Sequence, residues 1–410
     1  MRTSNFLLLA SAWLLACGGR VDASVPDSGG PPIDPPVTPT GFSTAAHGPM
    51  PTVGSTGGKT LAHPVVVPVY FPSEGHEIDI DAFLALLPGS EYWRRTTSEY
   101  GVGDVVIGAP IVTKEALPAQ MSNEDLRTWL ASRFEGGATG WPWAADPNAI
   151  YALFLPETTK LVGEMGESCR DFKAYHGELH QGLNHTVFAV VPRCIVDGVP
   201  VVDELTRSAS HELIEAATDP FTDSHRAYWT TDYDHVAWSL LTFGEIGDMC
   251  AFEPQAYPRA LGAFSVARGW SNQAAAAGHD PCGPGLDGDV YFNAALVLND
   301  TIAVKALGTT IMTKGVVVPM GKSRTIDVEL FSEAETDGWT LEALDTSDFT
   351  GGAKELSFVW DDATGNNGAV RKLTIDRVAA GAGGGTTFAV VSRKGPDVAH
   401  FWFGYAGNGP

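Results

Sequence analysis

The chain has 410 residues and a formal net charge of −23, with 44% hydrophobic and 18% charged residues. This composition is typical of globular proteins, and the length favours two domains over a single core. The strong negative charge argues against nucleic-acid binding, because recognition of phosphates needs a basic surface.

Residues 1–17 resemble a bacterial lipoprotein signal peptide. Arg2 gives a short basic start, residues 6–16 are mainly apolar, and Cys17 follows Leu14-Leu15-Ala16 as in a lipobox. Acyl chains on Cys17 would attach the protein to a bacterial membrane, facing the periplasm or the cell surface. The alternative is an ordinary secretory signal in which Cys17 is incidental.

Residues 18–60 are rich in glycine, proline and serine and hold few large apolar side chains. We expect a disordered tether without a core of its own.

Four further cysteines follow the signal: Cys169, Cys194, Cys250 and Cys282. An even number in an exported chain predicts two disulfides, for which the sequence allows three pairings. We favour Cys169–Cys194 and Cys250–Cys282, because they close the shorter loops. The alternative is that some of them are free buried thiols.

Residues 61–283 are predicted to form an α/β or α+β domain, because strand-like and helix-like patterns alternate. Pro68 places the first strand at an edge or a bulge. Ser122 and Asp125 have the spacing of a helix-capping pair. We expect strands near 64–71, 104–112, 149–156 and 186–192, helices near 78–87, 92–101 and from 122, and irregular chain at 169–185 and 221–282.

The central stretch of the domain is Ser210-His211-Glu212-Leu213-Ile214-Glu215. His211 and Glu215 are four residues apart and share one face of a helix. The pattern resembles the H-E-x-x-H zinc helix with a carboxylate in place of the second histidine, and carboxylates are accepted zinc ligands. Glu212 is then the candidate general base. We expect Asp203 to cap this helix and Pro220 to end it.

A catalytic zinc site needs a third protein ligand. Glu245 and Asp248 are the preferred candidates, because they lie in a glycine-containing turn next to Cys250; Asp219 and His176 remain alternatives. Against any metal site, Glu212 and Glu215 could be surface charges at a helix end. Five other histidines are expected to be surface or hydrogen-bonded residues: His180, His185, His225, His235 and His279.

Residues 284–410 show short strand-like runs separated by turns, which predicts an all-β, Ig-like sandwich. Because this part carries no cluster of catalytic residue types, we interpret it as a structural or adhesive module.

Two blocks carry a family resemblance. His211-Glu212-Leu213-Ile214-Glu215-Ala216-Ala217-Thr218-Asp219-Pro220 and Glu245-Ile246-Gly247-Asp248-Met249-Cys250 resemble the exordium-like, phosphate-induced secreted proteins of plants and their bacterial relatives. The resemblance covers about residues 65–282. It implies an extracellular protein connected with cell-wall growth and signalling, and it assigns His211, Glu212, Glu215, Glu245 and Asp248 to the shared motif.

The functional hypothesis is a surface lipoprotein with a zincin-like domain that hydrolyses peptides. Zinc would be the cofactor, with His211 and Glu215 as ligands, Glu245 and Asp248 as candidates for the third, and Glu212 as base. The competing hypothesis is a non-enzymatic surface or signalling protein that binds a peptide or cell-wall glycan and keeps a structural or vestigial metal site.

Overall fold

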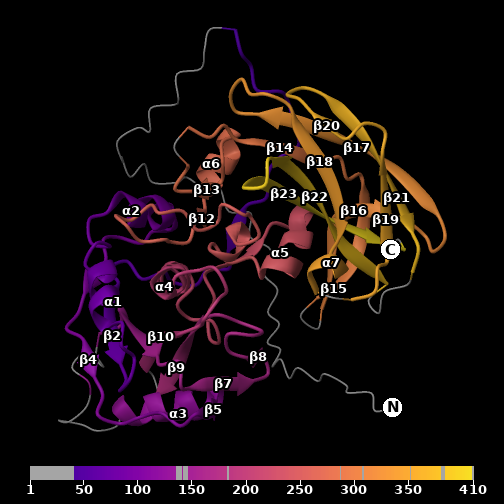
Figure 1. The fold of residues 1–410 in the computed structure, drawn as a ribbon. Helices are drawn as coiled ribbons and strands as arrows, with labels where there is room; N and C mark the ends of the chain where they lie inside the picture. Colours follow the sequence, from indigo (N-terminus) through magenta and orange to yellow (C-terminus); the bar gives the residue numbers. More distant parts are fainter. Residues whose placement is uncertain are drawn as a thin grey trace, which may run out of the picture.

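The computed structural model describes residues 41–134, 141, 146–181, 184–286, 288–306, 309–350, 352–379 and 384–408. The predicted signal peptide, Cys17 and residues 18–40 of the predicted tether lie outside the described residues. In the described part, no helix combines the length and apolarity needed to cross a bilayer. An α/β half and a β-rich half lie side by side (Figure 1).

A mixed sheet forms the centre of the α/β half, in the order β3-β2-β6-β10-β9, with β4 also pairing with β2. Strands β2, β3, β4, β6 and β10 run parallel, and β9 is an antiparallel edge strand on β10. Their bounds are β2 Val65–Tyr70, β3 Val106–Ile107, β4 Ile111–Val112, β6 Ala149–Leu155, β9 Tyr175–Gln181 and β10 Asn184–Pro192.

Both faces of this sheet are apolar and covered. In β6, Ile150, Ala152 and Phe154 join the core beneath helices α1, α2 and α4, while the alternate residues join a second core beneath α3. This alternation follows from the two-residue period of a strand. The helices span α1 Glu77–Leu84, α2 Glu91–Thr97, α3 Asn123–Phe134 and α4 Val201–Thr218. The half is therefore a three-layer α/β/α unit.

The position of Pro68 differs from the predicted edge strand or bulge, because β2 is a central strand. The carbonyls of Val66 and Tyr70 accept bonds from the β3 and β4 side, so Pro68 faces the same side at the gap between those two short strands. No ladder N–H is needed at that gap, which explains how proline is tolerated.

Of three predictions about the ends of helices α3 and α4, two are confirmed and one is wrong. Ser122 and Asp125 form the expected reciprocal cap of α3. Asp203 is not the cap of α4, because the helix begins at Val201 after Pro200, and Asp203 instead pairs with Arg259. The predicted end is confirmed at Thr218.

The two stretches predicted to be irregular contain regular elements. Residues 169–185 include β9. Its sequence shows no hydrophobic strand pattern, because the side chains on one face of the strand belong to a polar site. Residues 221–282 hold β11 Tyr228–Thr231, α5 Val236–Thr242, η4 Asp248–Cys250, β12 Gly269–Trp270, α6 Asn272–Ala277 and β13 Cys282–Gly283. These elements are short, so hydrophobic periodicity could not indicate them.

The β-rich half contains two sheets, and the strand-like runs predicted there coincide with strands, except that the first run, residues 290–292, lies mostly before β14, which begins at Phe292. The first sheet has the order β14-β17-β21-β19, and the second has the order β15-β16-β23-β22-β18-β20. Residues of both sheets, such as Leu330 and Trp402, belong to one apolar core. The strands are β14 Phe292–Leu296, β15 Asp300–Ala306, β16 Thr309–Val317, β17 Ser323–Ser332, β18 Trp339–Asp345, β19 Leu356–Trp360, β20 Thr364–Gly365, β21 Val370–Arg377, β22 Gly385–Lys394 and β23 Val398–Gly407.

The predicted tether ends earlier than residue 60. Strand β1 Val53–Ser55 pairs with β11, and the His47 ring stacks on Phe331 of β17 at 3.6 Å. Residues 41–60 therefore pack against both halves. The apolar core is also continuous between the halves, since Trp238 of α5 contacts Phe403 of β23.

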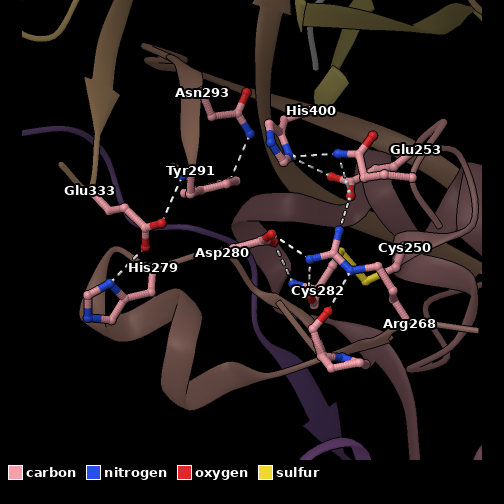
Figure 2. Close-up of polar contacts among 12 residues, drawn as sticks. Cys250, Glu253, Arg268, His279, Asp280, Cys282, Tyr291, Asn293, Glu333 and His400 are labelled. Carbon is pink, nitrogen blue, oxygen red and sulfur yellow. Dashed lines mark hydrogen bonds and ion pairs between the residues drawn. A yellow bond between two sulfur atoms is a disulfide. The ribbon is translucent and has the colours of Figure 1, made fainter. Parts of the chain in front are cut away.

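A polar network lies at the same junction (Figure 2). The fully buried Arg268 pairs with Glu253 at 3.0 Å and with Asp280 at 2.5 Å, and it also donates to the Cys282 carbonyl. His400 of β23 pairs with the same Glu253 at 2.9 Å. Because His400 belongs to the second half, the network joins the two halves.

Both predicted disulfides are confirmed. Cys169 is bonded to Cys194, and Cys250 is bonded to Cys282. The second bond fixes η4 to the junction network.

Candidate metal centre

Helix α4 carries three members of the centre on one side. His211 and Glu215, one turn apart, bring Nε2 and Oε2 to 3.3 Å. Glu212 and Glu215 are buried, and His211 is 14% exposed at its side chain. The helix packs on β10 with its apolar face, so these polar side chains are held at the edge of the sheet near β9.

Asp248 comes to the same point from the loop before Cys250. Its Oδ1 lies 3.3 Å from His211 Nε2, and its backbone N–H donates to Glu215 Oε1 at 3.0 Å. That bond orients Glu215 and leaves Oε2 directed at His211. The Cys250–Cys282 disulfide holds the other end of this short segment.

Gly247 allows the close approach of this loop to α4. A Cβ atom at this position would lie 2.9 Å from Glu215 Oε1 and 2.9 Å from His211 Nδ1, closer than side-chain carbons come to such atoms. The sequence motif therefore needs glycine here for space.

The donor atoms of His211, Glu215 and Asp248 have the spacing of a metal site. All three lie within 4.8 Å of one another. In a tetrahedron with metal–ligand bonds of about 2.0–2.1 Å, neighbouring ligand atoms are about 3.3 Å apart. The two distances from His211 Nε2 match that value. Imidazole and carboxylate ligands suit zinc, so these residues fit that ion.

His176 is a further buried histidine of the centre, and it contacts Glu212. It projects from the edge strand β9, and its Nδ1 is 3.2 Å from Glu212 Oε2 and 3.7 Å from Glu215 Oε2. His176, Glu212 and Glu215 form a second group of mutually close donor atoms, which shares Glu215 with the first.

Glu245 and Asp219 lie in a third group, beyond His176. Glu245 Oε2 is 4.0 Å from His176 Nε2, a buried nitrogen that has no hydrogen-bond partner among the residues that the structure describes. Arg226 pairs with Glu245 at 2.6 Å and with Asp219 at 3.1 Å. The guanidinium thus supplies positive charge to these two carboxylates. The structure separates Glu245 from the group around His211 and joins Asp248 to it.

The pKa values in the centre are shifted because histidines and carboxylates are buried close to one another. Burial lowers the pKa of His176, but the carboxylates of Glu245, Glu212 and Glu215 outweigh it and raise that pKa to about 10. Burial, with the Asp248 and Glu245 charges, raises the pKa of Glu215 to about 8 against the opposing effect of His211. Burial also raises the pKa of Asp248. Without an ion, the centre therefore holds protons that a divalent cation would displace.

Sequence reasoning identified the residues on α4 and both acidic loop residues, but it missed Arg226 and Gly247 as parts of the site. Arg226 stacks on Trp229, and its contacts come from a loop that no motif marks. It could not be found from spacing, since its partners lie 7 and 19 residues away.

Comparison with known proteins does not assign the chain to a family. No protein-family model and no curated protein matches the chain. Two crystal structures of wild-type OgpA from Akkermansia muciniphila align with 87% and 85% of this chain and with 98% and 94% of theirs. The sequence identities are 11% and 10%, and a TM-score of 0.23 for both is too low to support an argument about fold or function.

Proposed function

We propose that the protein is a zinc-dependent hydrolase that acts on peptides, with His211, Glu215 and Asp248 as the metal ligands. The observation that carries the proposal is the convergence of these three donor atoms from α4 and η4 at tetrahedral spacing. His211 and Asp248 keep 14% and 25% of their side chains exposed, so the centre is not fully enclosed by protein.

Glu212 is the general base in this proposal. It follows His211 directly in the sequence and lies close to Glu215 in space, and His176 Nδ1–H donates to its Oε2, which fixes the carboxylate in one orientation. Glu212 accepts a proton from the attacking water and returns it to the leaving amine. When bound, the zinc ion would supply positive charge that makes a water more acidic and a carbonyl more electrophilic.

The wider assignment rests on the sequence resemblances. We propose a zincin-like α/β domain of the exordium-like group, followed by an Ig-like sandwich, in a lipoprotein anchored through Cys17 to a bacterial membrane. The mixed sheet with its antiparallel edge strand β9 beside α4 supports the first part. The two disulfides support an oxidising, extracytoplasmic compartment.

The depth of the centre favours one competing function. Glu215 and His176 expose only 3% and 4% of their side chains, as expected for a structural ion. The competing proposal is a surface protein that binds a peptide or cell-wall glycan without cleaving it.

Zinc content tests the centre first. The purified full chain is expected to hold a zinc ion at this centre, so that His211→Ala binds one zinc ion fewer per chain than the parent, whereas His279→Ala, a histidine paired with a single glutamate elsewhere, binds as many as the parent. Folding of each variant is checked by circular dichroism. Zinc retained at full stoichiometry in folded His211→Ala would exclude these ligands.

Hydrolysis of casein and of a peptide library separates the two functions. Glu212→Gln is expected to keep the zinc and to lose about 10²–10⁴-fold in kcat, the range for removing a general base. Glu157→Gln, at an exposed site, is the matched control. Equal activity of Glu212→Gln and the parent would remove Glu212 as base, and zinc without activity in the parent would favour the binding protein.

A further inference from the structure

A further group of donor atoms lies on β9 and β10, separate from the groups around His211 and His176. His176, Glu178 and His180 alternate along this strand and share the sheet face that looks toward α4. His185 of β10 is the cross-strand partner of His180, and the two rings meet edge to face at 4.7 Å. Glu178, His180 and His185 thus gather at the end of the β9–β10 pair where Gln181 is paired with Asn184.

The three side chains converge on one point. His180 Nε2 is 3.3 Å from Glu178 Oε1, His185 Nδ1 is 2.9 Å from Glu178 Oε2, and all three donor atoms lie within 4.8 Å of one another. These distances are close to the ~3.3 Å edge of a tetrahedral site with bonds of about 2.0–2.1 Å.

Glu178 is buried without a fixed positive charge. Its side chain is 0% exposed. Among the described residues, the partners of its carboxylate oxygens are the backbone N–H groups of Asp223 and Ser224, the Ser224 hydroxyl and the two imidazoles. Arg127 donates to the backbone carbonyl of Glu178 and not to the carboxylate. Buried carboxylates are normally paired with a cation or bound to a metal.

The surroundings resemble the outer shell of a metal site. Asp223 and Ser224 orient the Glu178 carboxylate, as hydrogen-bond donors behind a ligating carboxylate do. His180 and His185 remain 43% and 35% exposed, which leaves a path for an ion and room for a water as the fourth ligand.

From this geometry we propose a second metal site, formed by Glu178, His180 and His185, for a divalent ion of the zinc and copper class. Two imidazoles and one carboxylate select such ions over magnesium or calcium. The ion would join the β9–β10 hairpin to the loop that contains Asp223 and Ser224. Arg226, which contacts Glu245, follows in the same loop.

Zinc stoichiometry of the full chain tests this site independently of the first. After metal removal and titration with zinc chloride, followed by gel filtration and elemental analysis, we expect two zinc ions per parent chain. His211→Ala and the double variant His180→Ala/His185→Ala are each expected to hold one, and His279→Ala two.

The two proposals fail differently. One zinc in the parent that His211→Ala alone removes would overturn the second site and leave the first. One zinc that only the double variant removes would overturn the first site and leave the second. A double variant that still binds two ions also overturns the second site.

Two further measurements cover the case in which the double variant does not fold. His211→Ala by itself must keep one zinc, and a zinc-free His211→Ala protein would overturn the proposal. Ser224→Ala is expected to raise the Kd of that remaining zinc by about 10-fold at unchanged stoichiometry. An unchanged Kd would count against the site.

Discussion

At the scale of single residues, the key side chain is His176, which lies between Glu212 and Glu245. One ring nitrogen contacts Glu212 and the other faces Glu245 across 4.0 Å. It lies near Glu215 but outside the group of atoms around His211. We therefore treat it as a positioning residue for Glu212 and not as a ligand.

This role predicts a specific result for His176 variants. His176→Ala is expected to lower kcat about 10–100-fold with little change in KM or zinc content, because the hydrogen bond that orients Glu212 is lost. His176→Asn, whose amide N–H can replace Nδ1–H, is expected to recover part of the activity. Steady-state kinetics and elemental analysis provide the measurements. Loss of zinc in both variants would instead make His176 a ligand.

At the scale of elements, the centre forms where the loop and η4 pack against the polar side of α4. The contact brings the Asp248 N–H to Glu215 and places Gly247 directly against His211 and Glu215. The disulfide to Cys282 and the bond from Trp270 N–H to the Ile246 carbonyl hold the loop there. Metal affinity thus depends on the fit of a loop as well as on the ligands.

Gly247→Ala tests that fit. The new Cβ must push the loop from α4, so zinc affinity is expected to fall on the order of 10–100-fold although all ligands remain. Gly285→Ala is the control, because a Cβ there meets nothing within 4 Å. Competition with a chromophoric chelator measures both Kd values, and equal values would show that the loop adapts without cost.

The two halves act as one body at the scale of the whole molecule. They share an apolar core, and Figure 2 shows Arg268 between Glu253 and Asp280 with His400 joining from β23. Since Cys250 and Cys282 lie in this network, the β-rich half supports the loop that carries Asp248. The interpretation of residues 284–410 as a structural or adhesive module did not include support of this loop.

Arg268→Met is expected to lower the free energy of unfolding by about 3–5 kcal/mol, because Glu253 and Asp280 then remain buried without their cation. Denaturant unfolding measures the change. Arg324→Met, at an exposed position, should stay within about 0.5 kcal/mol of the parent. A similar small change for Arg268→Met would show that the network does not stabilise the junction.

His400 gives the junction a pH dependence. Burial and Arg268 lower its pKa, but Glu253 and Asp280 outweigh them and raise it above 6.5. Stability from protonated His400 is therefore fully present below the unfolded pKa of about 6.5 and is lost as pH rises through the folded pKa.

The comparison with His400→Gln isolates this contribution. The difference in Tm between parent and variant is expected to be largest near pH 6 and to shrink as the pH is raised toward 9. A constant difference, or one that grows with pH, would contradict the assignment.

The sequence alone determined the features that depend on local pattern. The i, i+4 pair His211 and Glu215, the capping pair Ser122 and Asp125 and most strands of residues 284–410 follow from spacing and periodicity. For the disulfides the sequence allowed three pairings, and the preference for shorter loops selected the pairing that the structure shows. Such signals are carried by neighbours in the chain or by small loops, so they survive without knowledge of the packing.

Only the tertiary structure decided the features that join distant segments. It separated Asp248 from Glu245, brought Arg226 to the latter, and placed His176, Glu178 and His180 on one edge strand beside His185 of β10. It also put Pro68 in a central strand and made the β-rich half part of the support for the centre. These outcomes depend on which surfaces meet when the apolar faces are buried, and no local spacing in the chain encodes that choice.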